Sequence, residues 1–476
     1  MTPLTLNPDR LFPAEPGVRA IARTIYHEIS RLPLLSPHGH LDARLFRDNE
    51  PFSDPADLLV SSDHYVVRLL HARGLSLDAL GTRSRPGAPG DEQDHPLEGR
   101  EIWRALCTHW EALGGTPSRL WLEHILSDLF ELEERPSPET ADSSYDHCVA
   151  MLQRDELRPR SLYRRFNLEV LTTTDPPAAD LAVHDALLGD SSFTGRLLPT
   201  FRPDGVVDPN RADFTENLTA LEQVTGIDLS DYAGLVRALE QRRDAFRERG
   251  ATASDHGVEI TTTEHLPEAD AARLYRAVRA GEANAAQIEA FKGHMVSELA
   301  RMAVDDGLVM QLHLGVARDY SRSVFERFGQ DVGQDFPVNV EYTRTLRPML
   351  SRFGDNPGFR AVLYTIDETL YSREIGPLVS YFPSLYAGAP WWFLDAPDAM
   401  ARAFAAVGEV AGIANCSGFV DDTRSLCGIG ARHDVARRSC AAYLARVVAE
   451  HRIGEDEAVA LAKGYAYDTP KAVFKL

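Results

Sequence analysis

The stretch Leu-Pro-Leu-Leu-Ser-Pro-His-Gly-His, residues 32–40, indicates the fold of this chain. Its apolar first half is typical of a short buried strand that ends near Pro37. Side chains alternate along a strand, so His38 and His40 point the same way and can bind one metal ion. Gly39 leaves room between the two imidazoles. Two histidines at this spacing are common by chance, so two surface histidines beside a turn remain the alternative.

Short apolar runs recur along the rest of the chain, separated by stretches with helical spacing. They are residues 168–171, 197–201, 256–260, 309–313, 361–364, 384–387 and 418–420. With the first run they make about eight, the number of strands in a (β/α)8 barrel. We therefore predict an α/β fold, a (β/α)8 TIM-type barrel.

The long segment between the first two predicted strands has the pattern of helices. Ile102, Leu106, Trp110 and Leu113 recur at helical spacing and share one face. We expect one barrel domain over residues 1–476, with a helical insertion at 45–160 on the catalytic rim of the barrel.

The composition limits the partners of this protein. A formal net charge of -21 argues against nucleic-acid binding and means that an anionic substrate needs a local cluster of arginines. The sequence shows neither a signal peptide nor a run long enough to span a membrane, and its five cysteines contain no C-x-x-C pair. We expect a cytoplasmic protein, and a homo-oligomer is compatible with the sequence.

Two further residues fit a metal site with the first two histidines. His313 ends the run at 309–313, and Asp422 follows the run at 418–420. Three imidazoles and one carboxylate suit a divalent metal, above all zinc, and leave a position open for water or substrate. Taken singly, His313 could be a hydrogen-bonded core histidine and Asp422 a helix N-cap. No lysine precedes Lys292 to form a carbamate between two metals, so we expect one metal ion.

Other polar and aromatic residues could bind a substrate. Arg202 can hold a carboxylate through two hydrogen bonds, although a surface salt bridge is the alternative. Tyr65 is a catalytic phenol only if nearby positive charge lowers its pKa, and otherwise an amphipathic rim residue. Trp391 and Trp392 either wall a pocket or pack the core.

In order, these motifs resemble the uronate isomerase (glucuronate isomerase) family of the amidohydrolase superfamily, from about residue 20 to the C-terminus. The motifs are Pro37-His38-Gly39-His40-Leu41, Asp63-His64-Tyr65, Thr173-Thr174-Asp175-Pro176, Leu198-Pro199-Thr200-Phe201-Arg202-Pro203-Asp204, Ser254-Asp255-His256, Gln311-Leu312-His313-Leu314-Gly315, Asp331-Val332-Gly333, Trp391-Trp392-Phe393 and Asp422-Thr423-Arg424-Ser425. The chain departs from the family at Ser36, where an Asp is common.

The resemblance implies a (β/α) barrel that interconverts D-glucuronate with D-fructuronate and D-galacturonate with D-tagaturonate. It also implies a metal site, usually zinc, made by His38, His40, His313 and Asp422. By the same resemblance, the substrate site is lined by His64, Tyr65, Arg202, Trp391 or Trp392, and Arg424.

We therefore predict an aldose–ketose isomerase that acts on hexuronates through a cis-enediol. Tyr65 or Asp422 serves as the base, Arg424 stabilises the developing negative charge, and Arg202 holds the substrate carboxylate. The main alternative is a metal-dependent hydrolase of the same superfamily, such as a sugar-lactonase, in which Asp422 takes a proton from metal-activated water. A catalytically dead sugar-acid-binding protein is the second alternative.

Overall fold

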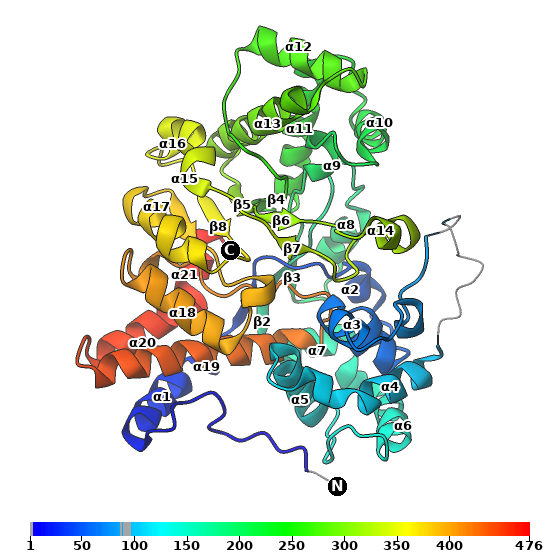
Figure 1. The fold of residues 1–476 in the computed structure, drawn as a ribbon, viewed down its shortest axis with the longest axis vertical. Helices are drawn as coiled ribbons and strands as arrows, with labels where there is room; N and C mark the ends of the chain where they lie inside the picture. Colours follow the sequence, from blue (N-terminus) through cyan, green and yellow to red (C-terminus); the bar gives the residue numbers. More distant parts are fainter. Residues whose placement is uncertain (1–2, 86–87, 89–96) are drawn as a thin grey trace.

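Parallel strands run through the centre of the molecule and helices surround them (Figure 1). The computed structural model describes residues 3–85, 88 and 97–476. Its strands are β1 Leu34–Ser36, β2 Leu168–Thr172, β3 Arg196–Leu198, β4 Ala253–His256, β5 Val309–His313, β6 Val316–Ala317, β7 Phe336–Pro337, β8 Ala361–Tyr364 and β9 Leu385–Ala387.

The barrel strands follow one another in chain order. One parallel sheet has the order β1-β2-β3 and another the order β4-β5-β8-β9, while β6 and β7 form a small antiparallel hairpin. Single bridges continue the order: Phe201, just after β3, pairs with Ser254 of β4, and Ala387 of β9 pairs with Cys416. The amide of His40 donates to the carbonyl of Thr423 over 3.0 Å, which joins the last barrel segment to the first. This is the arrangement of the predicted (β/α) barrel.

Two predicted strands need correction. The fourth lies at Ala253–His256, earlier than the predicted 256–260, because its polar residues are all buried and hydrophobic pattern alone cannot find them. The run at 418–420 forms no strand. Gly418 has a φ of 85° and Asp422 a φ of 42°, so the backbone there leaves the extended conformation that a ladder needs.

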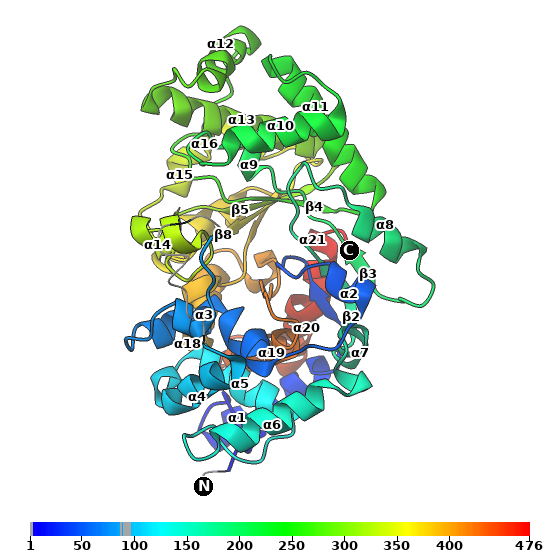
Figure 2. The ribbon, with the colours of Figure 1, turned by 90° about the vertical axis from the view of Figure 1, so that its right-hand side faces the viewer.

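Helices connect and cover the strands, as Figures 1 and 2 show. They are α1 Pro16–Ile29, α2 Arg44–Asp48, α3 His64–His71, α4 Gly99–Thr108, α5 Pro117–Asp128, α6 Ala141–Leu152, α7 Pro159–Arg165, α8 Ala182–Gly189, α9 Asp204–Val207, α10 Phe214–Thr225, α11 Tyr232–Glu248, α12 Glu268–Arg279, α13 Ala285–Asp306, α14 Arg322–Phe328, α15 Tyr342–Thr345, α16 Arg347–Phe353, α17 Gly376–Tyr381, α18 Pro397–Gly408, α19 Gly428–Ala449, α20 Glu455–Lys463 and α21 Thr469–Val473. None of the helices in the described ranges is both long and apolar enough to cross a membrane.

Helices α2 to α7 lie between β1 and β2, where the sequence predicts an insertion. Helices α3 to α6 gather on one side of the barrel in both views (Figures 1 and 2). Their buried side chains, among them Trp103, Leu106 and Phe130, form one hydrophobic cluster with residues of strands β1 to β3, such as Leu34 and Leu171. The bounds of the insertion at 45–160, and its status within a single domain, stay a prediction.

Helix α13 shows how local sequence places a site residue. At its start, Asn284 accepts from the amide of Gln287, whose side chain accepts from the amide of Asn284 in return. At its end, Gly307 takes a φ of 79°, which L side chains rarely adopt. The helix therefore stops where β5 is about to begin, and β5 carries His313 at its carboxyl end.

Candidate active site

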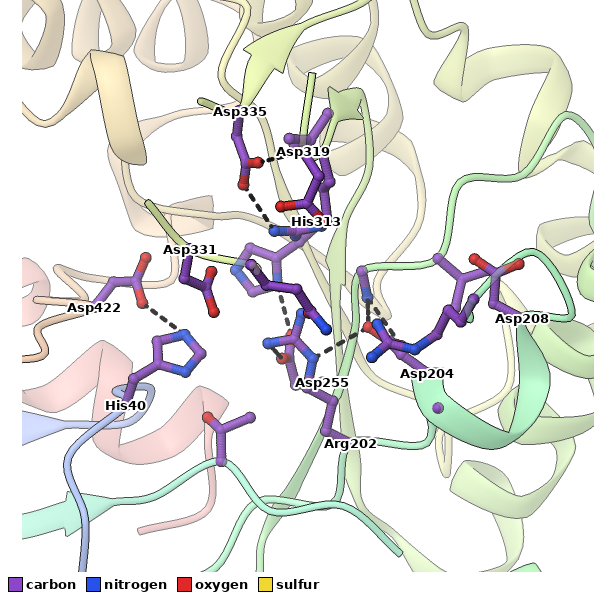
Figure 3. Close-up of a pocket in the computed structure, with 18 of the residues that line it drawn as sticks. His40, Arg202, Asp204, Asp208, Asp255, His313, Asp319, Asp331, Asp335 and Asp422 are labelled. Carbon is purple, nitrogen blue, oxygen red and sulfur yellow. Dashed lines mark hydrogen bonds and ion pairs between the residues drawn. The ribbon is translucent and has the colours of Figure 1, made fainter. Parts of the chain in front are cut away.

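One cavity of about 390 Å³ opens among the carboxyl ends of the barrel strands (Figure 3). The predicted site residues on its wall are His38, His40, His64, Arg202, His313, Trp391, Trp392, Asp422 and Arg424. Active sites of (β/α) barrels occupy this end of the strands, because loops from every strand meet there. The structure thus brings together nearly the whole predicted set.

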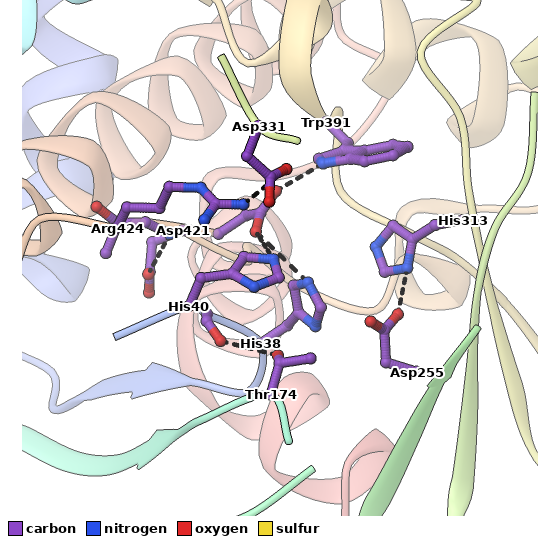
Figure 4. Close-up of polar contacts among 12 residues, drawn as sticks. His38, His40, Thr174, Asp255, His313, Asp331, Trp391, Asp421 and Arg424 are labelled. Carbon is purple, nitrogen blue, oxygen red and sulfur yellow. Dashed lines mark hydrogen bonds and ion pairs between the residues drawn. The ribbon is translucent and has the colours of Figure 1, made fainter. Parts of the chain in front are cut away.

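His38, His40 and Asp422 form the centre of the candidate metal site (Figure 4). The Oδ1 atom of Asp422 lies 3.4 Å from Nε2 of His38 and 3.2 Å from Nε2 of His40. That carboxylate oxygen is buried and has no hydrogen-bond partner among the described residues. Two imidazoles and a carboxylate oxygen that converge in this way fit a divalent cation.

His313 joins the site through a carboxylate that the sequence analysis did not assign. Its Nδ1 lies 2.7 Å from Oδ1 of Asp255, and His38, Asp255 and His313 form a second group of close ligand atoms. A metal-binding histidine commonly bonds a carboxylate through its other nitrogen, which fixes the ring. The predicted four-residue set is therefore divided over two groups that share His38.

The histidines differ in charge because their surroundings differ. Burial lowers the pKa of His40 to about 4, and also lowers the pKa of His313, so both are neutral and can offer a lone pair near neutral pH. Burial acts on His38 in the same direction, but the carboxylates of Asp255 and Asp422 outweigh it and raise its pKa. Negative charge is thus concentrated around His38, where a cation would be favoured.

Asp422 is held as a carboxylate. Its burial would raise its pKa, but the close imidazoles of His38 and His40 hold the pKa well below its usual value. Its second oxygen, Oδ2, accepts a hydrogen bond of 2.6 Å from Nε1 of Trp391. Trp391 therefore orients this carboxylate as well as lining the cavity.

Arg424 and His64 complete this side of the site. The Nη2 of Arg424 pairs with Asp331 over 3.1 Å, and its buried Nε has no hydrogen-bond partner among the described residues. Both ring nitrogens of His64 are also buried without such a partner, and burial followed by the charge of Arg424 lowers its pKa well below the usual value. Donors and acceptors left in this state are available to a ligand.

Tyr65 does not meet the condition set for a catalytic base. It is buried rather than on the rim, and it is not among the cavity-wall residues of the described chain. Burial raises its pKa well above the usual value, and Arg432 offsets this only in part because its guanidinium pairs with Asp395. The ring packs against Trp392, with centroids 4.5 Å apart, so Trp392 separates it from the cavity.

Arg202 is not an ordinary surface residue. Its Nε donates to Oδ2 of Asp204 over 3.1 Å, and its Nη1 lies 3.2 Å from Oδ2 of Asp255 (Figure 3). Trp391 and Trp392 both line the cavity, and Trp392 is also part of the core around α3. Trp392 therefore both walls the pocket and packs in the core, the two roles that the sequence left open.

Sequence reasoning assigned no role to several polar residues on the cavity wall. Asp255 and Asp331 lie in motifs of the family resemblance but were given no function, and Arg318 and Asp335 were not singled out at all. Asp255 could have been found if β4 had been placed correctly, since it lies near the carboxyl end of that strand. The other three come from the segment around β6 and β7, where no periodic pattern marks them.

A parallel barrel that gathers imidazoles, carboxylates and arginines at the carboxyl ends of its strands defines a (β/α) barrel enzyme with a candidate metal site. The model of the glucuronate isomerase family matches residues 18–474 of this chain. The chain therefore belongs to the glucuronate isomerase family.

Individual relatives agree with this assignment. The chain is similar to the uronate isomerase of Rhizorhabdus wittichii, with 46% identity over 100% of this chain and 99% of that protein. The structure resembles the glucuronate isomerase of Caulobacter crescentus, with a TM-score of 0.96, 40% identity and coverage of 99% of this chain and 97% of that one. It also resembles the uronate isomerase of Thermotoga maritima, with a TM-score of 0.91, 29% identity and 99% coverage of both chains. These relatives favour the isomerase over the hydrolase.

Proposed function

We propose that this protein is a uronate isomerase that interconverts D-glucuronate with D-fructuronate and D-galacturonate with D-tagaturonate. The observation that carries the proposal is one cavity whose wall holds both the His38, His40 and Asp422 cluster and several arginines. A uronate needs both, since its carbonyl end reacts while its carboxylate must be held. The relatives that match over the full chain are named for this activity.

We propose zinc as the metal, held by His38, His40, His313 and Asp422. Imidazole nitrogens and a carboxylate oxygen are suitable zinc ligands. The Oδ1 atom of Asp422, which has no hydrogen-bond partner among the described residues, would be one of them. When bound, the cation would polarise the oxygen atoms at the reacting end of the sugar. The hydrogen bond between His313 and Asp255 would keep the second imidazole nitrogen free for this purpose.

We propose Asp422 as the base that moves hydrogen from C2 to C1 of the open-chain sugar through a cis-enediol. Its lowered pKa keeps it ionised, so it can accept a proton near neutral pH. Tyr65 has the opposite property, because its raised pKa keeps the phenol protonated. Within this proposal Tyr65 is therefore a proton donor and not a base; its ring packs against Trp392 of the cavity wall.

The remaining residues would bind and orient the substrate. Arg424 would stabilise the negative charge that develops on the enediolate oxygens, since its buried Nε has no hydrogen-bond partner among the described residues. Arg202 binds the carboxylate at the far end of the sugar. His64 offers ring nitrogens to the hydroxyl groups, while Trp391 and Trp392 wall the cavity.

The test is incubation of the purified protein with D-glucuronate and with D-galacturonate in heavy water, followed by NMR. Ketose formation and deuterium uptake at the exchanged carbon support an isomerase that uses a proton-transfer mechanism. The matched control is Asp422→Asn, which fits the positive φ at this position because Asn tolerates it. Absence of ketose with the wild-type protein would contradict the proposal.

We also propose that the protein acts in the cytoplasm. All five cysteines are free and buried, as expected for a protein of a reducing compartment. Fractionation of the source cells, with the activity measured in each fraction, tests this location.

A further inference from the structure

Two arginines that are far apart in the sequence converge on Gly257, just after β4. A Cβ built on Gly257 would lie 3.0 Å from each of three atoms: Nη2 of Arg202, Nη2 of Arg318 and Oδ2 of Asp204. The two Nη2 atoms can therefore be separated by no more than twice that distance. Arg202 follows β3 and Arg318 follows β6, and the two guanidinium groups meet on the cavity wall beside Gly257, in a space where a side chain would crowd them.

Carboxylates hold the other nitrogens of these arginines. Asp204 accepts from Nε of Arg202 over 3.1 Å and from the amide of Gly257 over 3.0 Å, which fixes it in the floor of the space. Asp335 accepts from Nη1 of Arg318 over 3.2 Å. Neither Nη2 makes a hydrogen bond to any described residue. Each arginine is thus oriented by an acid while it keeps one donor group turned toward the other.

The position of this space suits the far end of an open-chain sugar acid. Asp255 bonds His313 at the candidate metal site, and Gly257 lies two residues farther along the chain. Two residues of extended backbone span roughly 6–7 Å, which is comparable to the length of a six-carbon chain. Asp422 and Gly257 line the same cavity, so a substrate whose carbonyl end lies at Asp422 can extend toward Gly257.

The charge of the cavity wall explains why one arginine is not sufficient. Acids outnumber arginines on this wall. Arg202 already faces two of them, Asp204 and Asp255, so its charge is largely offset before any substrate arrives. A second guanidinium group is needed to bind an anion against this excess of negative charge.

We propose that Arg318 is a specificity-determining residue whose guanidinium group, together with that of Arg202, binds the substrate carboxylate in the space above Gly257. This inference rests on the proposed function, since it names the anion-binding end of that same site. Planar guanidinium groups suit a carboxylate because each can donate along one of its oxygens.

The test compares Arg318→Met with Arg322→Met. Arg322 lies four residues away, its side chain is 90% exposed and it pairs with Glu326, so it controls for loss of an arginine in this segment. The substrates are D-glucuronate and D-glucuronamide, in which a neutral amide replaces the carboxylate. We expect Arg318→Met to raise KM for D-glucuronate by about tenfold or more while it leaves D-glucuronamide nearly unchanged.

A second variant tests the space without removing a charge. Gly257→Ala adds a methyl group 3.0 Å from both Nη2 atoms and from Oδ2 of Asp204, so it should crowd the two arginines and reproduce the selective rise in KM for D-glucuronate. Metal content, measured by elemental analysis, should equal that of the wild type in both variants. If Arg318→Met raises KM equally for both substrates, or for neither of them, the inference is wrong. If instead the wild type does not isomerise D-glucuronate at all, the proposed function fails first, and the two failures are distinguishable.

Discussion

Trp391 donates a hydrogen bond from its indole Nε1 to Oδ2 of Asp422 over 2.6 Å. This contact uses one oxygen of the carboxylate and leaves the other, Oδ1, facing His38 and His40. The neighbouring Trp392 also lines the cavity, but its Nε1 is buried without a hydrogen-bond partner among the described residues. The two tryptophans therefore form a natural pair for mutagenesis.

We expect Trp391→Phe to lower kcat by about 10- to 100-fold, because a hydrogen bond to a charged group contributes about 1.5–3 kcal/mol. Trp392→Phe makes the same change of indole to phenyl but removes no hydrogen bond to Asp422. The kcat of this variant should therefore fall less than that of Trp391→Phe. Steady-state kinetics of both variants provide the measurement. Equal losses in the two variants would show that the indole nitrogen of Trp391 does not matter.

We expect one tightly bound divalent metal ion per chain. The two groups of candidate ligands in the described residues share His38, and Lys292, the first lysine of the chain, pairs with Glu289 in α13 rather than reaching the site. Elemental analysis of protein purified without chelators should give about one equivalent. Removal with a chelator should lower Tm, since an ion that binds only the folded state stabilises it. Two equivalents would contradict this prediction.

We expect Tyr65→Phe to lower turnover by about 10²-fold and, at the same time, to raise Tm. The hydroxyl of Tyr65 is buried without a hydrogen-bond partner among the described residues, and such a group costs about 1–3 kcal/mol. Its removal should stabilise the fold, while a proton donor is lost. Thermal unfolding and steady-state kinetics measure the two effects. Unchanged turnover would exclude Tyr65 from the chemistry.

We expect Arg202→Met to reduce the preference for D-glucuronate over D-glucose. Loss of a partly desolvated Arg–carboxylate contact costs about 2–5 kcal/mol, whereas the neutral sugar has no carboxylate to lose. The substitution also leaves Asp255 and Asp204 without their counter-ion, so the preference ratio is a cleaner measurement than turnover alone. Metal content should stay unchanged. A preference equal to that of the wild type would assign the carboxylate to another arginine.

We expect the ionisation of Asp319 to make the stability of the protein depend on pH. Burial, and then repulsion from Asp335 and Asp331, raises the pKa of Asp319 to about 6, although Arg318 and Arg211 oppose this. The unfolded chain has a pKa of about 4, so the stability associated with the neutral acid is present below about pH 4 and is lost as pH rises through about 6.

In Asp319→Asn the side chain stays neutral at every pH. The Tm of this variant relative to the wild type should therefore increase between about pH 4 and pH 7. The backbone φ of 53° at this position accommodates Asn. Asp355→Asn, at an exposed position, is the control substitution. A difference in Tm that does not change with pH would refute the effect.

Much of the barrel could be predicted because several strands are continuous apolar runs. Strands β5 and β8 have the predicted bounds, Val309–His313 and Ala361–Tyr364. Buried parallel strands show such runs because helices cover them. Strand β4 could not be found in this way, since its residues Ser254, Asp255 and His256 are polar and are buried only because they contact one another and the site.

The candidate site was predictable where residue type and order carry the information. The early histidine pair, His313 and Asp422 line one cavity, and their joint binding of a metal stays a prediction. The raised pKa of Tyr65 was not predictable, because it depends on burial of the ring among side chains such as Trp121 and Trp392 that are distant in the sequence. The convergence of Arg318 on Gly257 was likewise hidden, since it brings together side chains from distant segments of the chain.

The hydrogen bond between His40 and Thr423 also bears on the biosynthesis of the protein. It joins a residue near the start of the chain to one near the end, and Asp422 stands next to the latter. At about 5–20 residues per second, a ribosome needs tens of seconds to synthesise the intervening chain. During that time the nascent protein exposes two histidines without their carboxylate partner. The complete site can therefore form only after nearly all of the polypeptide has been made, and prematurely terminated products should lack activity however well their first helices fold.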